Sequence, residues 1–169
     1  MKFLVACVAL VLTGTTPLAA APQQLQGKSV VVGMSPYTPA RADDGTPSAA
    51  RSITVTTYVS SQGRAFVRAD HVGSGEGRPS SRHEKGPGTG TAHFNGNTLV
   101  ASGNFGTGAG QMTVTFDPSY RTCNATVRVG LADAKPLSYI AFNGKRYTAT
   151  GKTVVSNVSC AIRDGNALQ

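Results

Sequence analysis

MTVTFDPSYRTCNATVRV, residues 112–129, decides the fold class of this chain. Apolar and polar residues alternate on both sides of the sequence DPSY, which begins at Asp117 and interrupts the alternation. Successive side chains of a strand point to opposite faces, so the pattern predicts a β-hairpin with one buried and one solvent-facing side. Cys123 lies on the apolar side of the second strand, together with Ala125 and Val127. The hairpin therefore predicts an antiparallel sheet that directs a cysteine into its core.

The end of the chain shows the same alternation, over residues 152–163. The residues predicted to be buried share one parity and are Val154, Val158, Cys160 and Ile162. Cys123 and Cys160 both fall on apolar faces, which makes them natural partners across a core. We therefore expect a disulfide between them.

The first residues have the layout of a secretory signal peptide. Lys2 precedes a short apolar run, and a cluster of small residues ends at Ala21. We assign residues 1–21 to the signal, with cleavage near Ala20 or Ala21, and residues 22–169 to one all-β domain. The apolar run is too short for a permanent membrane helix, and no later segment of the sequence is long and apolar enough to span a membrane.

The mature chain is expected to be periplasmic or secreted, oxidised and basic. Removal of the signal also removes Cys7, so three cysteines become two, and an exported chain with one pair of cysteines usually joins it. The formal net charge of the full sequence is +8, and only Lys2 is lost with the signal. Such a charge favours encounters with anionic surfaces.

The rest of the mature chain alternates short strands with turns. A first strand is predicted over residues 28–34. Three more hairpins are predicted over residues 51–70, 91–105 and 137–150, and tight turns are expected at residues 61–63, 95–97 and 143–144. Proline-rich or glycine-rich composition predicts mobile loops near residues 35–50 and 71–90.

Many short strands joined by tight turns predict an antiparallel all-β fold, because the connections are too short for crossover helices. No stretch after the signal keeps a helical apolar period. Since the hairpins are local, we favour a single meander that closes into a small β-barrel. A two-sheet sandwich is the alternative.

Few groups in the sequence indicate catalysis or cofactor binding. The glycine clusters lack the strand–turn–helix context of a phosphate loop, and no serine has the flanking glycines of a nucleophile elbow. His71, His83 and His93 are too widely spaced to predict a metal site. The two glutamates, Glu76 and Glu84, lie in a predicted loop, which does not favour a rigid carboxylate pair. We expect no cofactor, no metal and no enzyme activity, with an envelope hydrolase as the residual alternative.

Five cations gather around the hairpin over residues 51–70 and the loop after it. They are Arg64, Arg68, Arg78, Arg82 and Lys85. Arg64 and Arg68 share strand parity, with Phe66 between them, although Phe66 and Val67 compete for the inward face. A basic face with an aromatic side chain can hold a polyanion, and it can equally be a solvated surface. We take the five cations as the candidate polyanion-binding residues; export makes nucleic acid an unexpected partner.

Several phrases of the sequence resemble small uncharacterised exported proteins of soil alphaproteobacteria. They are TTYVSSQGRAFVR (residues 56–68), NTLVASGNFG (97–106), FDPSYRTCNATVRVG (116–130) and SNVSCAIRDGN (156–166). The resemblance covers most of the mature chain and implies a bacterial, periplasmic or secreted setting and a recurring place for the two cysteines. It supplies no catalytic or binding residues.

These observations favour an exported, non-enzymatic binding or interaction protein of the cell envelope. In one version its basic surface meets anionic envelope polymers. In the other version, a β-barrel with an apolar interior holds a small apolar ligand. An open apolar cavity with a polar mouth would favour the second version, and a filled core would exclude it.

Overall fold

The computed structural model describes residues 20–72, 81–84, 90–104, 109–129, 138–141 and 143–169. Within these ranges the chain forms three antiparallel sheets of five, four and three strands, preceded by one turn of 3-10 helix, η1 (Gln23–Leu25). The all-β prediction is confirmed. The described residues include no helix long and apolar enough to cross a membrane.

The strands of each sheet are neighbours in the following orders. The five-stranded sheet is β12 (Val154–Asp164), β1 (Lys28–Tyr37), β3 (Ser52–Val59), β4 (Ala65–Val72) and β5 (Ser81–Glu84). The four-stranded sheet is β6 (Gly90–Asn95), β7 (Thr98–Asn104), β8 (Ala109–Phe116) and β9 (Cys123–Val129). The three-stranded sheet is β10 (Ser138–Ile140), β11 (Arg146–Ala149) and β2 (Ala40–Ala42).

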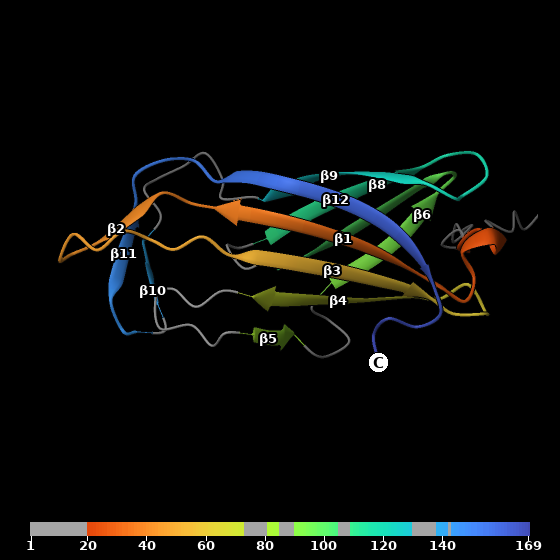
Figure 1. The fold of residues 1–169 in the computed structure, drawn as a ribbon, viewed down its shortest axis with the longest axis horizontal. Coiled ribbons are helices and arrows are strands. Elements are labelled where there is room, and N and C mark those ends of the chain that lie inside the picture. Colours follow the sequence, from red (N-terminus) through yellow and green to blue (C-terminus); the bar gives the residue numbers. More distant parts are fainter. Residues whose placement is uncertain (1–19, 73–80, 85–89, 105–108, 130–137, 142) are drawn as a thin grey trace, which may run out of the picture.

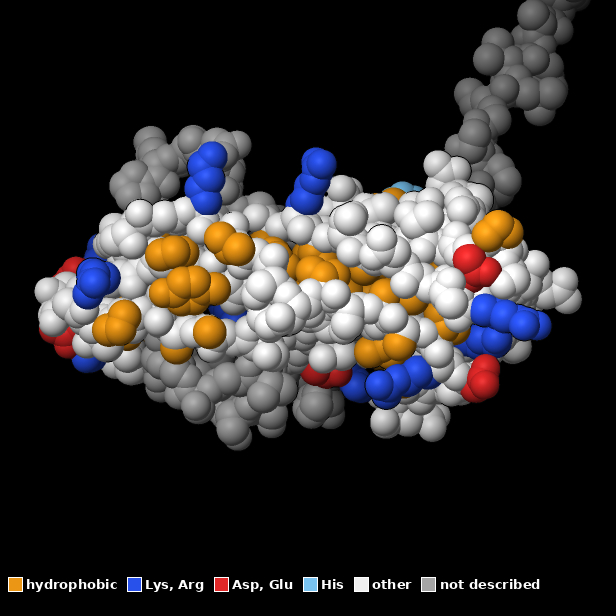
Figure 2. Space-filling model, turned by 45° about the horizontal axis from the view of Figure 1, so that its top comes forward, with side chains coloured by type: hydrophobic (Ala, Val, Ile, Leu, Met, Phe, Trp, Pro, Cys, Tyr) orange, Lys and Arg blue, Asp and Glu red, His pale blue; other side chains and the backbone are white. Residues whose placement is uncertain are grey.

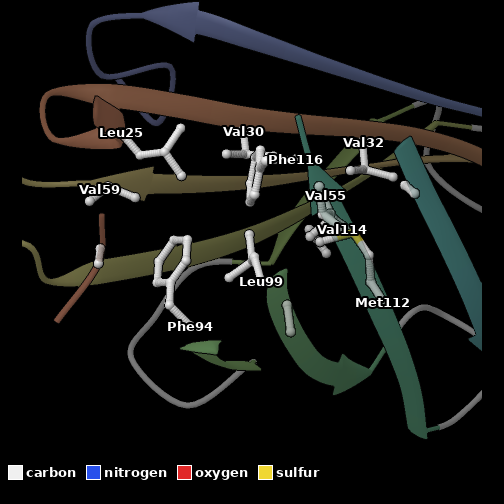
Figure 3. Packing of buried hydrophobic residues seen from close by; sticks show 14 of the residues in the cluster. Leu25, Val30, Val32, Val55, Val59, Phe94, Leu99, Met112, Val114 and Phe116 are labelled. Carbon is white, nitrogen blue, oxygen red and sulfur yellow. The ribbon is translucent and has the colours of Figure 1, made fainter. Parts of the chain in front are cut away.

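The five-stranded and four-stranded sheets lie face to face and share one hydrophobic core (Figures 1 and 3). Side chains with none of their surface exposed come from both sheets and include Val30, Val32, Val55, Leu99, Met112 and Val114. Leu25 of η1 is also fully buried and covers one end of the same core. A side chain beside a water-sized cavity would keep some accessible surface, so the interior around these residues is filled.

This arrangement fits the sandwich alternative better than the favoured barrel. Among the described strands, hydrogen-bonded ladders join the members of each sheet and do not close the two large sheets into one cylinder. The chain order also differs from a simple meander, because β12 returns to pair with β1 at the other end of the sequence. Local hairpins were correctly predicted, whereas the pairing of the first and last long strands leaves no local signal in the sequence.

The three-stranded sheet lies at one end of the sandwich and is formed by two separate excursions of the chain (Figure 1). One excursion runs from β1 through β2 to β3, and the other leads from β9 through β10 and β11 to β12. This sheet has a small core of its own, in which Tyr139 stacks on Tyr147 with ring centroids 5.5 Å apart. Thr38 and Thr153 lie in the two segments that connect this sheet to β1 and β12. Their hydroxyl oxygens are 2.7 Å apart, so a hydrogen bond joins the two segments.

The predicted disulfide between Cys123 and Cys160 is confirmed. Their Cα atoms are 5.7 Å apart and their sulfurs are bonded. Cys123 begins β9 and Cys160 lies in β12, which are edge strands of the two large sheets. The disulfide therefore joins the two sheets at an edge where the ladders do not.

A β-bulge in β12 overturns part of the predicted burial of this strand. Gly33 of β1 faces Ser159 and Ser35 faces Ser156, so that two residues of β12 oppose Met34. The extra residue shifts the alternation by one position. The affected side chains are Val155, which packs against the core, and Val154 and Val158, which are 59% and 39% exposed.

The sequence did not predict the bulge, because an alternating pattern alone cannot show where a strand contains an extra residue. Asn157 has the positive φ of 53° that marks the bulge, and asparagine tolerates this conformation better than most residues. Val154 now lies opposite Tyr37 of β1, which is 37% exposed. Exposed hydrophobic side chains are accordingly visible on the face shown in Figure 2.

Two stretches predicted as loops contain strands. β1 continues to Tyr37 despite Pro36, and β2 follows within the proline-rich stretch over residues 35–50. β5 lies within the predicted loop over residues 71–90 and pairs with β4, although its sequence SRHE carries no apolar alternation. Residues 73–80 and 85–89 of that predicted loop lie outside the described residues. A short, charged strand is typical of a sheet edge, where it discourages pairing with other chains.

The DPSY turn between β8 and β9 is organised by the Asp117 carboxylate. Its Oδ1 accepts hydrogen bonds from the backbone N–H groups of Arg121 and Thr122, at 2.7 and 2.6 Å. The other oxygen, Oδ2, accepts from the N–H and the hydroxyl of Ser119. The Ser119 hydroxyl, followed by the Thr122 amide, holds the pKa of Asp117 well below its usual range.

Loss of the disulfide should destabilise the protein substantially. The two cysteines are 37 residues apart, and a closed loop of that length stabilises by about 4 kcal/mol in the chain-entropy model. We expect the Cys123→Ser/Cys160→Ser double variant to unfold at clearly lower urea concentration than the oxidised protein. Wild-type protein treated with reductant is the control and should match the variant. Equal stability of oxidised and reduced wild type would contradict this expectation.

The Asp117→Asn substitution tests the turn through its pH dependence. A carboxylate with a lowered folded-state pKa contributes stability above the unfolded-state value of about 3.9, and this contribution is lost as the pH falls below it. The melting temperature of wild type should therefore exceed that of Asp117→Asn at pH 5, and the difference should shrink toward pH 2. Asp43→Asn removes the same charge from an exposed residue and should show a smaller difference at pH 5. A pH-independent gap between wild type and Asp117→Asn would reject this account.

Candidate functional site on the outer face of the five-stranded sheet

The outer face of β4 presents the side chains that the sequence predicted as a basic surface. Ala65, Val67 and Ala69 pack against the core, so the residues between them point away from it. Val67 therefore occupies the inward position, and Phe66 is 50% exposed on the outer face. Phe66 and Arg68 therefore share the outer face, and Arg64, which immediately precedes β4, is exposed.

An aromatic pair forms the centre of this outer face. Phe66 lies directly opposite Tyr58 of β3, and their rings stack with centroids 6.4 Å apart and an angle of 25° between the planes. Cross-strand aromatic pairs stabilise a sheet, and here the pair also leaves half of a large ring in contact with solvent. The pair offers a flat apolar surface to a partner molecule.

Arg64 provides an exposed positive charge beside this aromatic pair. It ends the turn between β3 and β4, where its carbonyl oxygen accepts a 2.8 Å hydrogen bond from the Ser60 N–H. Gly63 precedes it with a φ of +75°, a conformation that glycine adopts without strain. The Arg64 guanidinium forms no ion pair within the described part of the chain, so its charge is available to a partner.

Arg68 is held by the protein itself. Its Nε lies 3.0 Å from a carboxylate oxygen of Asp70, and its side chain is only 23% exposed. Its Nη1 donates a hydrogen bond to the backbone carbonyl of Leu168. Arg68 therefore anchors the C-terminal segment to β4, and its charge is partly compensated by Asp70.

The C-terminal segment, residues 165–169, crosses the outer face next to the aromatic pair. The Ser29 hydroxyl donates to the Gly165 carbonyl at 2.8 Å and accepts from the Ala167 N–H at 2.9 Å. These bonds join the segment to β1, whereas Arg68 joins it to β4. Thr56 of β3 faces outward between the two attachment points and is nevertheless only 3% exposed, because the face is covered there.

Arg163 is a further cation of this face that the sequence analysis did not identify. It lies opposite Ser29 of β1, which in turn lies opposite Tyr58 of β3. Ile162 packs against the core, so the neighbouring Arg163 side chain points outward, where it is exposed. The register places Arg163, Ser29, Tyr58 and Phe66 in one row across four strands. The alternation of β12 predicts an outward direction for Arg163, but its place in the same row as Tyr58 depends on long-range strand pairing.

The remaining predicted cations cannot be added to the same surface. Arg82 lies in β5 opposite His71, and its side chain is outside the described residues. Arg78 and Lys85 also lie outside them. The structure therefore brings together Arg64 and Arg68 of the five predicted residues and adds Arg163.

The two histidines whose side chains the structure describes lie on different strands, His71 on β4 and His93 on β6. His71 is buried with 5% exposure, and His93 is exposed on β6. The side chain of His83 lies outside the described residues. Within the described ranges, no group of three or more His, Cys, Asp or Glu side chains could hold a metal ion.

Several other charges are compensated locally. Lys145 Nζ lies 2.6 Å from a carboxylate oxygen of Asp44, beside the three-stranded sheet. This hydrogen bond, helped by Thr46, holds the pKa of Asp44 well below its usual range and raises the pKa of Lys145. Lys28 similarly lies 3.7 Å from Asp164. Figure 2 shows Lys and Arg side chains spread over one face, some of them near acidic side chains.

Comparison with protein families, with curated proteins and with solved structures found no match to this chain. The resemblance to exported alphaproteobacterial proteins therefore stays a prediction.

Replacement of Arg68 should destabilise the protein. The Arg68→Ser variant loses the ion pair with Asp70 and the hydrogen bond to Leu168. Bonds of charged groups contribute more than neutral ones, and we expect a loss of about 1–2 kcal/mol in the free energy of unfolding. Urea denaturation measures this loss. Arg64→Ser is the matched control and should change stability by less than about 0.5 kcal/mol; equal effects of the two substitutions would show that Arg68 is not an anchor.

Proposed function

We propose that the protein is an exported, non-enzymatic binding protein whose outer sheet face binds anionic polymers of the cell envelope. The single observation that carries this proposal is the row of Arg163, Tyr58 and Phe66, flanked by Arg64. It combines two exposed cations with a stacked aromatic pair in which Phe66 is half exposed. A periplasmic or secreted location is part of the proposal and is supported by the signal-like N-terminus and by the disulfide.

The spacing of the cations suits an extended polymer. Arg163 and Phe66 are three strand-to-strand steps apart, or roughly 14 Å at the usual separation of neighbouring strands. Arg64 lies two residues beyond Phe66, roughly 7 Å further along the strand. The C-terminal segment covers Ser29, which lies between Arg163 and Tyr58 in the row. A chain with repeated negative charges can pass over this segment and contact both arginines while its apolar surfaces lie on the Tyr58–Phe66 pair. A small anion can reach only one arginine at a time.

The overall charge supports the same proposal. The sequence has 16 Lys and Arg against 8 Asp and Glu. An excess of this size attracts a polyanion over distances longer than direct contact. The row then determines where the polymer is held.

The alternative of a small apolar ligand inside a barrel receives less support. Val30, Val55 and Met112 would line such an interior, and none of them has accessible surface. A ligand would have to separate the two sheets, which the disulfide holds together at one edge. A hydrolase of envelope polymers is the other alternative and would need catalytic groups that the outer face, as described, does not present.

Binding to an acidic polysaccharide should be strong at low salt and weak at physiological salt. Between about 0.01 M and 0.15 M salt the electrostatic screening length falls from about 30 Å to about 8 Å. Polygalacturonate is a suitable probe, and anionic lipid vesicles form the second arm of the titration. We expect the Arg64→Ser/Arg163→Ser variant to bind about 30-fold more weakly, since each of its two lost contacts contributes on the order of 1 kcal/mol.

The matched control is Arg128→Ser/Arg146→Ser, which removes the same charge from β9 and β11, outside this face. Equal weakening in both double variants would reject the outer face and leave only non-specific attraction. Binding that is indifferent to salt would favour an apolar ligand site. Shortening of the polysaccharide during the titration would show that the protein hydrolyses it, and would contradict a purely binding function.

A further inference from the structure

Ala21 is the first of the described residues to join the main hydrophobic core. Ala21 is 5% exposed and belongs to the main hydrophobic core together with Leu25. Its backbone N–H donates a hydrogen bond to the carbonyl of Gly63 in the β3–β4 turn, with the two atoms 3.4 Å apart. Ala20, one residue earlier, is exposed. The hydrophobic core therefore includes Ala21 but not Ala20.

The residues after Ala21 strengthen this boundary. The Pro22 carbonyl accepts a 3.0 Å hydrogen bond from the Leu25 N–H and thereby forms η1. The Gly27 N–H then donates to the Val59 carbonyl at 2.8 Å, which directs the chain into β1. Ala21, η1 and the end of β3 thus cover one end of the sandwich as a unit.

The sequence PLAAAP, residues 17–22, offers three bonds that follow an alanine and could be cut during export. Cleavage after Ala21 would remove a core residue and would have to break the bond to Pro22, a tertiary amide whose nitrogen carries no hydrogen. Cleavage after Ala19 would place Pro17 three residues before the cut. A substrate bound as an extended strand uses backbone donors, which proline lacks and Leu18 supplies.

We propose that export processing cuts the peptide bond between Ala20 and Ala21. Water adds across this amide: the C–N bond breaks, Ala20 keeps the new carboxylate, and the nitrogen of Ala21 becomes the free α-amine of the mature protein. The new amine is charged near neutral pH and faces the Gly63 carbonyl, which can accept its hydrogen bond. The proposal rests on the export part of the proposed function and is independent of what the outer face binds.

N-terminal sequencing and intact-mass analysis of the full chain, expressed in a Gram-negative host and recovered from the periplasm or medium, test the proposal. The expected N-terminus is Ala-Pro-Gln-Gln-Leu. A start at Pro22 or at Ala20 would overturn the assigned bond. Retention of the first residues, with the protein in the cytoplasm, would overturn export itself and is distinguishable from a shifted cut.

A stability comparison tests the structural part of the argument separately. A chain that starts at Pro22 lacks the buried Ala21 methyl group and the hydrogen bond to Gly63. Its melting temperature should be lower than that of a chain starting at Ala21 by roughly 2–4 °C. A chain starting at Ala20 is the matched control and should melt with the Ala21 chain. Equal melting temperatures for all three would show that Ala21 is not part of the fold's boundary.

Discussion

The bond between Cys123 and Cys160 is the constraint on which the sandwich depends. β9 and β12 are edge strands of two sheets whose hydrogen-bonded ladders are separate in the described chain. A shared hydrophobic core holds such sheets together without fixing their direction, because burial is not directional. The disulfide adds a fixed point at one edge, immediately after the Asp117 turn has set the start of β9. Sheet packing and strand register are thus specified by different interactions.

The β-bulge beside Met34 explains how one strand serves two environments. On one side of the bulge, Cys160 and Ile162 pack against the core and Arg163 points outward. On the other side, Val155 packs inward and the chain turns toward the three-stranded sheet. Without the extra residue, Val154 would take the inward position and Val155 the outward one. β12 therefore keeps a regularly alternating half, from Ser159 to Asp164, that adds Arg163 to the candidate binding face.

The sequence was informative wherever structure depends on neighbours along the chain. Alternation and turn residues were sufficient to predict the four hairpins, and the apolar parity of Cys123 and Cys160 was sufficient to pair them. The register of β1 with β12 depends on contacts between the two ends of the chain, so neither the sandwich topology nor the position of Arg163 could be read from a local pattern. β2 was missed because its three residues, ARA, are too few to establish an alternation, and β5 was missed because its sequence SRHE contains no apolar residue.

The same limit applies to the candidate site. Strand parity predicted one face for Arg64 and Arg68, but parity cannot predict contacts with residues from distant parts of the chain. Asp70 and the Leu168 carbonyl convert Arg68 from an expected binding residue into an anchor. Arg64 immediately precedes β4 and Arg163 lies in β12, so only long-range strand pairing places these two exposed cations on the same face.

The net charge of this protein attracts polyanions without selecting a position on its surface, and a specific binding site needs further local features. Lys28, Arg68 and Lys145 each lie beside an aspartate, so these cations contribute little to the field at a distance. The excess of 16 basic over 8 acidic residues must then come from cations without such a neighbour, and these draw any polyanion toward the surface. Attraction of this kind is not specific to a position. A position is distinguished only where cations flank an apolar surface that is also open, and on the outer sheet face that condition is met by the stacked rings of Tyr58 and Phe66.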